Sequence, residues 1–357
     1  MAQKPNHTSP DLLIHPGETI AEVLQDQKIS QKELAIRTDF TEKHISTVVN
    51  GKKPISSKLA LKLENALGIS ASFWKNLQTN YDFEVESFEE INNITSEETE
   101  ISKDISKPVE VLTGKELDSK ETPLKVWLLR QILGVNNLVS ITKLASGAYR
   151  AQFDVNTNDY VMYVWQYLCE KQCEAQTENQ LDIEKLQNNL SEIKSIMFED
   201  SQSHVKLIQN TLNDCGVLFT VNKHVPKAPI HGLTVKTKKG QVMVAMTIRY
   251  KYVDTFWFSL FHEIAHVIYK DYLTDQKNEE NAKAIEERAN NFAKDILINP
   301  EKYENFVEKK DLTASNIEDF AIKNNVLPTI VVGRLMKDGY IPWNQNTLRR
   351  KYEWITD

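Results

Sequence analysis

The sequence predicts a mainly α-helical protein with a small β-sheet, an α+β chain of roughly two or three domains. Its 357 residues exceed the length at which one hydrophobic core stops growing, and 41% hydrophobic content is sufficient for more than one core. Eleven glycines are few for this length. Apolar residues recur at helical spacing in several separate segments, so we expect helices to dominate.

The composition excludes some classes of protein. Lys and Arg number 43 against 50 Asp and Glu, a net charge of −7, so any DNA-binding surface must be local. Cys169, Cys173 and Cys215 form neither an even set nor a CxxC pair, which favours reduced, buried thiols in a cytoplasmic protein. No signal-peptide core and no run of about 18 apolar residues occurs, so we expect neither secretion nor a membrane anchor.

Such a local basic region lies at residues 30–58, where six Lys or Arg stand against three Asp or Glu. Ser30 and Glu33 form a capping box that opens one short helix, Asp39 breaks it, and Thr41 is placed to cap the next. Two short helices joined by a tight turn are typical of a helix-turn-helix. Composition alone leaves a plain helical hairpin with a solvated charged face as an equal alternative.

Residues 12–82 resemble the HigA-type antitoxins, which belong to the Xre-like helix-turn-helix repressors. The resemblance rests on HPGETIAEVL at 15–24 and on GKKPISSKLALKLENALGISASFWKNLQTNYD at 51–82. One departure is that the turn between the helices reads Asp39-Phe40, where the family usually has a glycine. The resemblance implies a DNA-binding bundle that binds double-stranded operator DNA as a homodimer, at inverted half-sites about 34 Å apart.

The same resemblance implies roles for individual residues of the DNA-binding bundle. Side chains near the start of the second helix would read base edges, and others would hold phosphates. The expected base readers are Lys43, His44 and Thr47, and the expected phosphate contacts are Gln31, Lys52 and Lys53. Exposed lysines are usually only solvated, so each phosphate contact also has that simpler interpretation.

Between the two motif-bearing regions, the composition shifts twice. Residues 83–121 are predicted to be an acidic linker, because residues 84–104 hold eight acids and one lysine and read as a solvated linker or a polar helix. Residues 122–185 are predicted to form a small helical region, from the apolar patterns at 123–135 and 159–176.

The stretch WFSLFHEIAHVIYKD holds two histidines four residues apart, with a glutamate beside the first. On an α-helix, His262 and His266 share one face and Glu263 lies next to them; Asp254 is placed to cap the start of this helix. Neutral imidazoles suit Zn²⁺, and the adjacent carboxylate then reaches a water rather than the metal. The alternative is a pair of core or salt-bridged histidines.

A third protein ligand is expected in AIEERANNFAKDILINP, residues 284–300, which predicts a second helix. Glu286 lies on its core side, and a core carboxylate needs a partner such as Zn²⁺. Glu287, about 100° further round the helix, is the competing ligand. Asn290, four residues after Glu286, is placed to accept the second N–H of a ligand histidine.

HExxH followed by E-x-x-A-N-x-F-A resembles the ImmA/IrrE metallopeptidases, over roughly residues 190–300. Residues 228–266 are similar to that family's short strands and active-site helix, which gives the expected small sheet. The resemblance implies a zincin-like metallopeptidase domain, whose bounds we place at 186–311. A C-terminal helical tail is expected at 312–357.

By this resemblance, His262, His266 and Glu286 hold Zn²⁺. Glu263 is the catalytic residue that takes a proton from the attacking water and returns it to the leaving amine. Residues 240–248 are predicted to present an edge strand to an extended protein substrate. The candidates for stabilising the oxyanion are His231, Tyr269 and Tyr272.

Together these features predict a DNA-binding transcriptional regulator, a HigA-like antitoxin or repressor, with a zinc-dependent endopeptidase domain that cleaves a repressor or partner protein. The alternative is an autorepressing antitoxin that binds a small toxin and operator DNA, with the peptidase domain vestigial or non-catalytic. The presence of Glu263 favours retained chemistry, because a purely structural zinc site needs no base.

Overall fold

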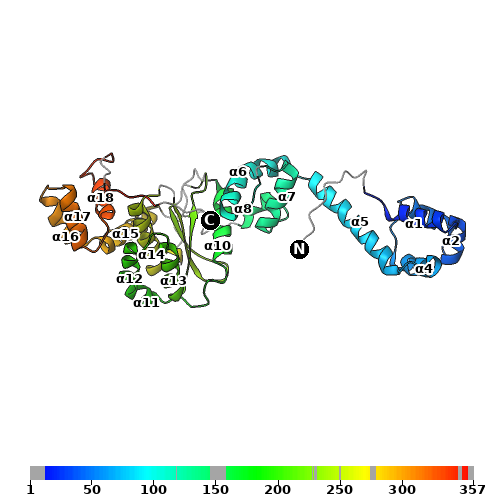
Figure 1. Cartoon of the computed structure of the whole chain (residues 1–357), viewed down its shortest axis with the longest axis horizontal. Helices are drawn as coiled ribbons and strands as arrows, with labels where there is room; N and C mark the ends of the chain where they lie inside the picture. Colours follow the sequence, from blue (N-terminus) through cyan, green and yellow to red (C-terminus); the bar gives the residue numbers. More distant parts are fainter. Residues whose placement is uncertain are drawn as a thin grey trace. The chain divides into compact units, whose positions relative to one another are not determined.

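The computed structural model describes residues 13–117, 119–144, 158–226, 228, 231–248, 251–273, 279–344 and 348–352. The chain divides into two compact units, Met1–Thr95 and Ser96–Asp357 (Figure 1). The predicted fold class, mainly helical with one small sheet, is confirmed. The predicted boundaries at residues 121, 185 and 311 fall inside the second unit and remain predictions. Parts of the predicted regions, namely residues 12, 145–157 and 353–357, lie outside the described residues.

The first unit is a bundle of helices. The described ones are α1 Pro16–Asp26, α2 Gln31–Thr38, α3 Glu42–Val49, α4 Ser57–Leu67 and α5 Ala71–Asn92. Side-chain oxygens of Ser30, Thr41 and Ser56 accept backbone N–H groups at the starts of α2, α3 and α4, which satisfies donors that the first helical turn leaves unpaired. The bundle closes around Leu34 and Trp74, both fully buried.

The turn between α2 and α3 shows how the chain replaces the expected glycine. Asp39 caps α2 in the left-handed conformation, with φ of 52° and ψ of 42°. Asp tolerates this region better than most residues, because its short polar side chain can bond locally. The backbone N–H of Asp39 reaches the last carbonyls of α2, and Lys62 Nζ lies 3.1 Å from its carboxylate. The departure from the family pattern therefore leaves the helix-turn-helix intact.

The second unit contains the sheet and the remaining helices. Its described helices are α6 Ser96–Thr113, α7 Thr122–Leu133, η2 Leu138–Ser140, α8 Ile141–Leu144, α10 Asp159–Cys173, α11 Ile183–Asn188, α12 Leu190–Ser195, η3 Ile196–Phe198, α13 His204–Asp214, α14 Val253–Ile268, η4 Asp271–Leu273, α15 Glu279–Leu297, α16 Pro300–Glu308, α17 Ala314–Lys323 and α18 Pro328–Lys337. None of these described helices, nor those of the first unit, has the length and hydropathy needed to cross a bilayer.

The region predicted as an acidic linker forms helices. α5 continues to Asn92, and α6 begins at Ser96. In α6, Ile101, Ile105 and Val109 are buried at spacings of four, and α6 packs against α10, while Lys103 and Lys107 are exposed. Of the two alternatives for residues 84–104, a solvated linker or a polar helix, the structure shows helix, because apolar residues at helical spacing outweigh the acidic composition.

The sheet has three strands, β1 Val217–Lys223, β2 Gly232–Lys236 and β3 Val242–Ile248, in the order β1-β3-β2. β3 is central, parallel to β1 and antiparallel to β2, and all seven of its residues are buried. The prediction that residues 240–248 present an edge strand is therefore wrong. A run of consecutive apolar residues is typical of a strand covered on both faces, which is where β3 lies.

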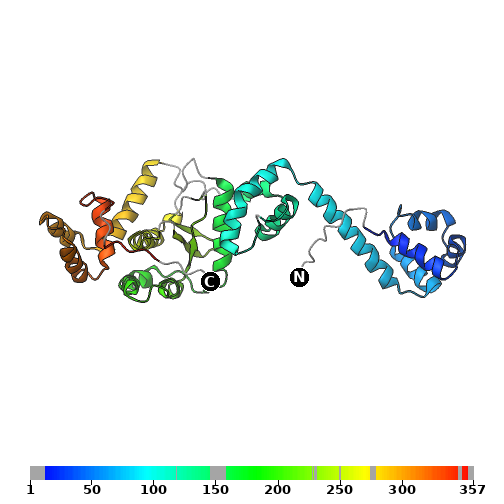
Figure 2. The ribbon, with the colours of Figure 1, turned by 45° about the horizontal axis from the view of Figure 1, so that its top comes forward.

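Helices cover both faces of this sheet. Figures 1 and 2 show α10 on one face and α13 and α14 on the other. On the α14 face, Phe219 and Val244 join the main hydrophobic cluster. On the opposite face, Asn222 donates to the thiol of Cys169 in α10. All three cysteines are buried and free.

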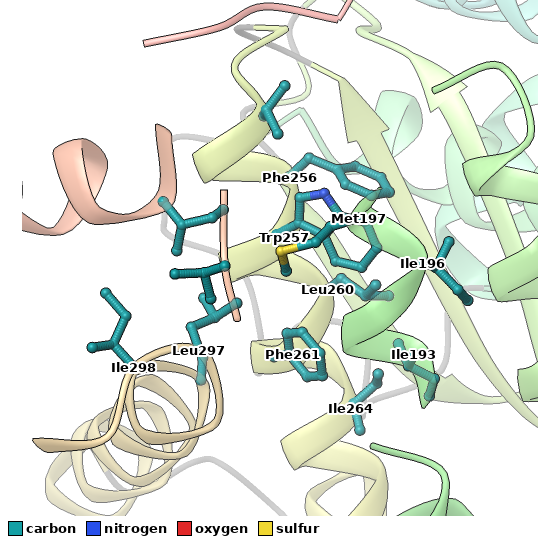
Figure 3. Packing of buried hydrophobic residues seen from close by; sticks show 14 of the residues in the cluster. Ile193, Ile196, Met197, Phe256, Trp257, Leu260, Phe261, Ile264, Leu297 and Ile298 are labelled. Carbon is teal, nitrogen blue, oxygen red and sulfur yellow. The ribbon is translucent and has the colours of Figure 1, made fainter. Parts of the chain in front are cut away.

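The core beneath α14 joins segments that are distant in sequence. Figure 3 shows Trp257, Leu260, Phe261 and Ile264 between side chains of α12 and η3 on one side and the end of α15 on the other. Residues of α17 and α18 belong to the same cluster, so the predicted C-terminal tail contributes to this core. The cluster packs against one face of α14, and His262 and His266 lie outside it on the same helix.

Candidate metal centre and DNA-binding face

The helix that carries His262 and His266 begins earlier than the sequence suggested. α14 starts at Val253, with Tyr252 as its N-cap, so the prediction of Asp254 as the cap is wrong. Asp254 is instead paired with Arg349, whose Nε and Nη2 lie 3.0 and 2.8 Å from its two carboxylate oxygens. A β-carbon on Gly333 would lie only 2.4 Å from this carboxylate, so a glycine is needed there. The carboxylate of Asp254 therefore pairs with Arg349, 95 residues away in the sequence, and does not cap the helix.

The three predicted ligand side chains converge from two packed helices. Nε2 of His262 and Nε2 of His266 on α14 lie 3.0 Å apart. Oε2 of Glu286 on α15 is 3.3 Å from the first, and its Oε1 is 3.5 Å from the second. The side chain of Glu286 is 51% exposed, so the prediction that it lies on the core side of its helix is wrong. Nitrogen or oxygen ligands about 2.0–2.1 Å from a tetrahedral Zn²⁺ are about 3.3 Å from one another. The separations therefore fit a zinc ion bound by these three residues.

Hydrogen bonds on the far side of each ring orient the two imidazoles. Nδ1 of His262 lies 3.1 Å from Oδ1 of Asn290, and Nδ1 of His266 lies 2.9 Å from Oδ2 of Asp271. An amide oxygen and a carboxylate accept, so each Nδ1 carries a proton and each Nε2 of a neutral ring presents a lone pair. Two lone pairs and the Glu286 carboxylate then face one another. Only a metal ion or a proton can hold such acceptors together.

Asp271 is a site residue that our sequence analysis missed. It is buried in η4, the turn that follows α14, and its second oxygen accepts from Arg288 on α15. This pairing orients His266 and ties the turn to α15, as carboxylates behind metal-binding histidines commonly do. The available signal was an aspartate five residues after the second histidine, close enough for a short turn to bring it back.

Glu263 lies beside the three converging side chains but outside the donor set formed by the described residues. It is buried, and its Oε2 accepts a hydrogen bond of 2.7 Å from the hydroxyl of Thr234 on β2. A β-carbon on Gly232 would lie 2.4 Å from its other oxygen, so β2 approaches closely only because residue 232 is glycine. Burial raises the pKa of Glu263, while the two histidines oppose that shift. A raised pKa suits a group that accepts and returns a proton.

The converging side chains shift one another's pKa values. Burial acts to lower the pKa of His262, but the bonded Glu286 and the charge of Glu263 outweigh it and raise that pKa overall. The hydrogen bond with His262 lowers the pKa of Glu286, against the effect of burial. Both shifts favour a negative carboxylate beside a positive centre, the arrangement that a bound metal ion would also satisfy.

The converging side chains open into a cavity of about 940 Å³, which we call the metal-site cavity. β2, α14, α15 and α18 contribute to its walls. Of the three oxyanion candidates, His231 lines this cavity, whereas Tyr269 and Tyr272 do not. Tyr269 packs against Phe292 and the guanidinium of Arg288. Glu287, the competing ligand, lines a separate pocket.

The predicted DNA-contacting residues lie on and around α2 and α3. Lys43, Lys52 and Lys53 are exposed, and Gln31 is half-buried at the start of α2. Two others have contacts within the bundle, because the ring of His44 stacks on Phe40 at 4.6 Å and the hydroxyl of Thr47 donates to the carbonyl of His44. Nε2 of His44 is buried. Base reading by His44 would therefore require its ring to leave Phe40.

Known families match both parts of the chain. The helix-turn-helix family model matches residues 20–74, which span α2 and α3. The IrrE N-terminal-like domain model, of peptidase family M78, matches residues 249–325, which span α14 and α15. The HTH-type transcriptional regulator YddM of Escherichia coli K12 is 32% identical over 63 residues, 18% of this chain and 67% of that protein. The chain belongs to the helix-turn-helix regulators.

This regulator also carries an IrrE-like domain, so both predicted family resemblances are confirmed. It is 41% identical over 69 residues to virulence-associated protein A' of Dichelobacter nodosus, which is 19% of this chain and 60% of that protein. The solved structure of the Pseudomonas aeruginosa antitoxin HigA with the higBA promoter is 32% identical, covers 21% of this chain and 82% of that chain, and has a TM-score of 0.20. The regulator thus spans less than two thirds of the virulence-associated protein.

Proposed function

We propose that this regulator binds operator DNA through α2 and α3 and cleaves a repressor or another partner protein with a zinc-dependent endopeptidase site. The observation that carries the proposal is the convergence of His262, His266 and Glu286 next to a buried carboxylate, Glu263, that is held by Thr234. A structural zinc site would use all its ligands for the metal and would need no separate base.

In this mechanism, His262, His266 and Glu286 hold the metal, with Asn290 and Asp271 fixing the two rings. Bound zinc supplies Lewis-acid chemistry, acidifying a water and polarising the substrate carbonyl. Glu263 takes the proton of the attacking water and delivers it to the leaving amine. Thr234 keeps the carboxylate of Glu263 in place between these two transfers.

The strand that receives the substrate in this proposal is β2 rather than β3. His231 accepts from the backbone N–H of Thr247, and pairing alternates along the antiparallel ladder, so the backbone groups of Gly232 and Thr234 point away from β3. Both residues line the metal-site cavity. An extended peptide can therefore add to β2 through main-chain hydrogen bonds and pass the metal ligands. His231, at the start of this edge, lines the same cavity and is our candidate for stabilising the oxyanion.

For the DNA-binding unit, the proposed partner is a promoter with inverted half-sites about 34 Å apart, bound by a homodimer. The exposed side chain of Lys43 and the half-buried Thr47 lie on α3, and Lys52 and Lys53 follow its end. These positions suit base contacts by the first pair and phosphate contacts by the second.

The decisive experiment is Glu263→Gln in the full chain. The amide keeps the size and the hydrogen-bonding reach of the carboxylate but cannot take a proton, so cleavage of the target should fall by about 10²-fold or more. Metal content should stay near that of the parent, because Glu263 is not a ligand. Proteomic comparison of cells expressing the parent or the variant would reveal the uncleaved target accumulating.

The alternative, an antitoxin that acts only by contact, predicts a different result. In that case Glu263→Gln would neutralise the toxin as well as the parent does, and no protein fragment would distinguish the two strains. This outcome would overturn the peptidase proposal and leave the helix-turn-helix regulator unaffected.

A further inference from the structure

One wall of the metal-site cavity carries lysines that the proposed mechanism does not use. Glu286, Asn290 and Lys294 follow one another at intervals of four along α15, and all three line the cavity. Eight residues of α-helix advance about 12 Å, so Lys294 lies well beyond the metal ligands. Lys337 reaches the same cavity from α18.

The other strongly basic groups of this wall are already paired. Arg349 is bound to Asp254, and Nε of Arg334 lies 2.6 Å from Asp338. Within the residues that the structure describes, Lys294 and Lys337 have neither an ion pair nor a side-chain hydrogen bond. The pair therefore remains available to an anionic group that enters the cavity.

The acidic groups that line the cavity do not offset these lysines. Asp254 is neutralised by Arg349, and Glu263 and Glu286 lie at the metal end, where a divalent cation would balance their charge. The apolar residues Leu297 and Ile330 line the same cavity, and Lys294 is half-buried whereas Lys337 is exposed. Lysines in a partly apolar cleft attract carboxylates more strongly than lysines on an open surface.

We propose that Lys294 and Lys337 bind a carboxylate of the protein substrate, a few residues away from the bond that is cut. The inference rests on the proposed peptidase function and specifies its substrate class. An extended chain advances about 3.3 Å per residue, so three or four residues of a bound peptide cover the distance of about 12 Å along α15 from the metal ligands to Lys294. That carboxylate is either an acidic side chain or the free carboxyl terminus of the substrate.

The test uses the full zinc-loaded chain with Glu263→Gln, so that binding is measured without cleavage. The probe is a library of ten-residue peptides with an apolar centre, in which each flanking position carries Glu or Gln and each peptide is made with a free or an amidated carboxyl terminus. We expect Glu-containing members to be enriched at least about tenfold over their Gln counterparts, as for hydrogen bonds to a charged group. Enrichment of free-acid members alone would identify the carboxyl terminus as the carboxylate that is bound.

The lysine pair is tested by adding Lys294→Gln and Lys337→Gln together. This change should abolish the enrichment, whereas Lys283→Gln, an exposed lysine of the same helix that does not line the cavity, should leave it unchanged. Equal capture of Glu and Gln members together with equal capture of free-acid and amidated members, or enrichment that survives the double change, overturns the inference. Cleavage of the same library by the parent chain is scored separately. Cleavage with no preference for acidic peptides would support the peptidase proposal and contradict the carboxylate site. Enrichment with no cleavage would support the carboxylate site and contradict the peptidase proposal.

Discussion

The two units of this regulator place their functional residues in opposite ways. In the helix-turn-helix unit, the predicted DNA contacts fall between Gln31 and Lys53, within one continuous stretch, and the lysines among them are exposed. In the second unit, the side chains of the proposed metal site come from β2, α14, η4 and α15, and several of them are buried. The first arrangement depends on local capping and turn geometry, whereas the second depends on tertiary packing. Changes should therefore act locally in one unit and cooperatively in the other.

The largest expected effect is the removal of a metal ligand. His266→Ala leaves at most two protein ligands, so the chain should lose its zinc, and the thermal transition of the second unit should fall by several degrees or more. Operator binding by the first unit should persist. Elemental analysis and calorimetry measure both effects, and zinc content equal to that of the parent would show that the metal site is wrongly assigned.

Two adjacent glutamates provide a matched control for this assignment. Glu286→Gln should reduce zinc content, because its oxygens lie 3.3 and 3.5 Å from the two histidine nitrogens. Glu287→Gln, which makes the same chemical change one residue away, should retain the zinc. The reverse result would transfer the ligand role to Glu287.

A smaller effect is expected behind the ligands. Asp271→Asn removes the charge that orients His266 and pairs with Arg288, so zinc affinity should fall by about 10–100-fold without loss of the fold. Competition with a chelator measures this shift. Asp295→Asn, an exposed aspartate of α15, is the control. Equal zinc affinity in the two variants would show that Asp271 does not support metal binding.

In the DNA-binding unit, changes should act on charge without disturbing the fold. Replacing Lys52 and Lys53 by Gln should weaken binding to every DNA sequence and lower the salt dependence by about two units of slope, since each phosphate contact contributes about 0.9. Replacing Lys309 and Lys310 of the second unit changes the net charge equally and should have little effect. Fluorescence anisotropy at several salt concentrations distinguishes the two pairs.

Sequence preference provides the complementary measurement in the same unit. Lys43→Ala and Thr47→Val should relax the choice of bases while leaving affinity for random DNA nearly unchanged. Parent protein that binds its own promoter no better than random DNA would contradict both the base contacts and the operator proposal.

The smallest expected effect lies in the turn between α2 and α3. Asp39→Gly removes the cost of the left-handed conformation at φ of 52° and also an exposed ion pair with Lys62, so the net gain in unfolding free energy should be less than about 1 kcal/mol. Asp39→Ala keeps the β-carbon but loses the polar side chain and should destabilise. Amide hydrogen exchange in α2 and α3 of the full chain reports both changes, and protection lowered by Asp39→Gly would contradict the expectation.

The sequence alone determined the features that are set by spacing within one element. Caps at Ser30 and Thr41 and the shared face of His262 and His266 follow from the helical repeat, and the spacing along α15 predicted Glu286 rather than its neighbour as the carboxylate beside the two histidines. The resemblances to known families supplied the roles of these residues. Such features depend on residues within one or two turns of the same helix, so they can be recognised from spacing along the sequence.

Tertiary structure alone decided which distant segments meet. Strand order placed β3 at the centre and gave the free edge to β2, although both segments read as strands. Asp254 pairs with Arg349 and does not cap α14. Thr234, on the strand before α14, donates to Glu263, and Asp271, in the turn after α14, pairs with His266. The physical reason is that buried polar groups must find partners, and which partner is nearest depends on how the helices pack around the sheet rather than on separation along the chain.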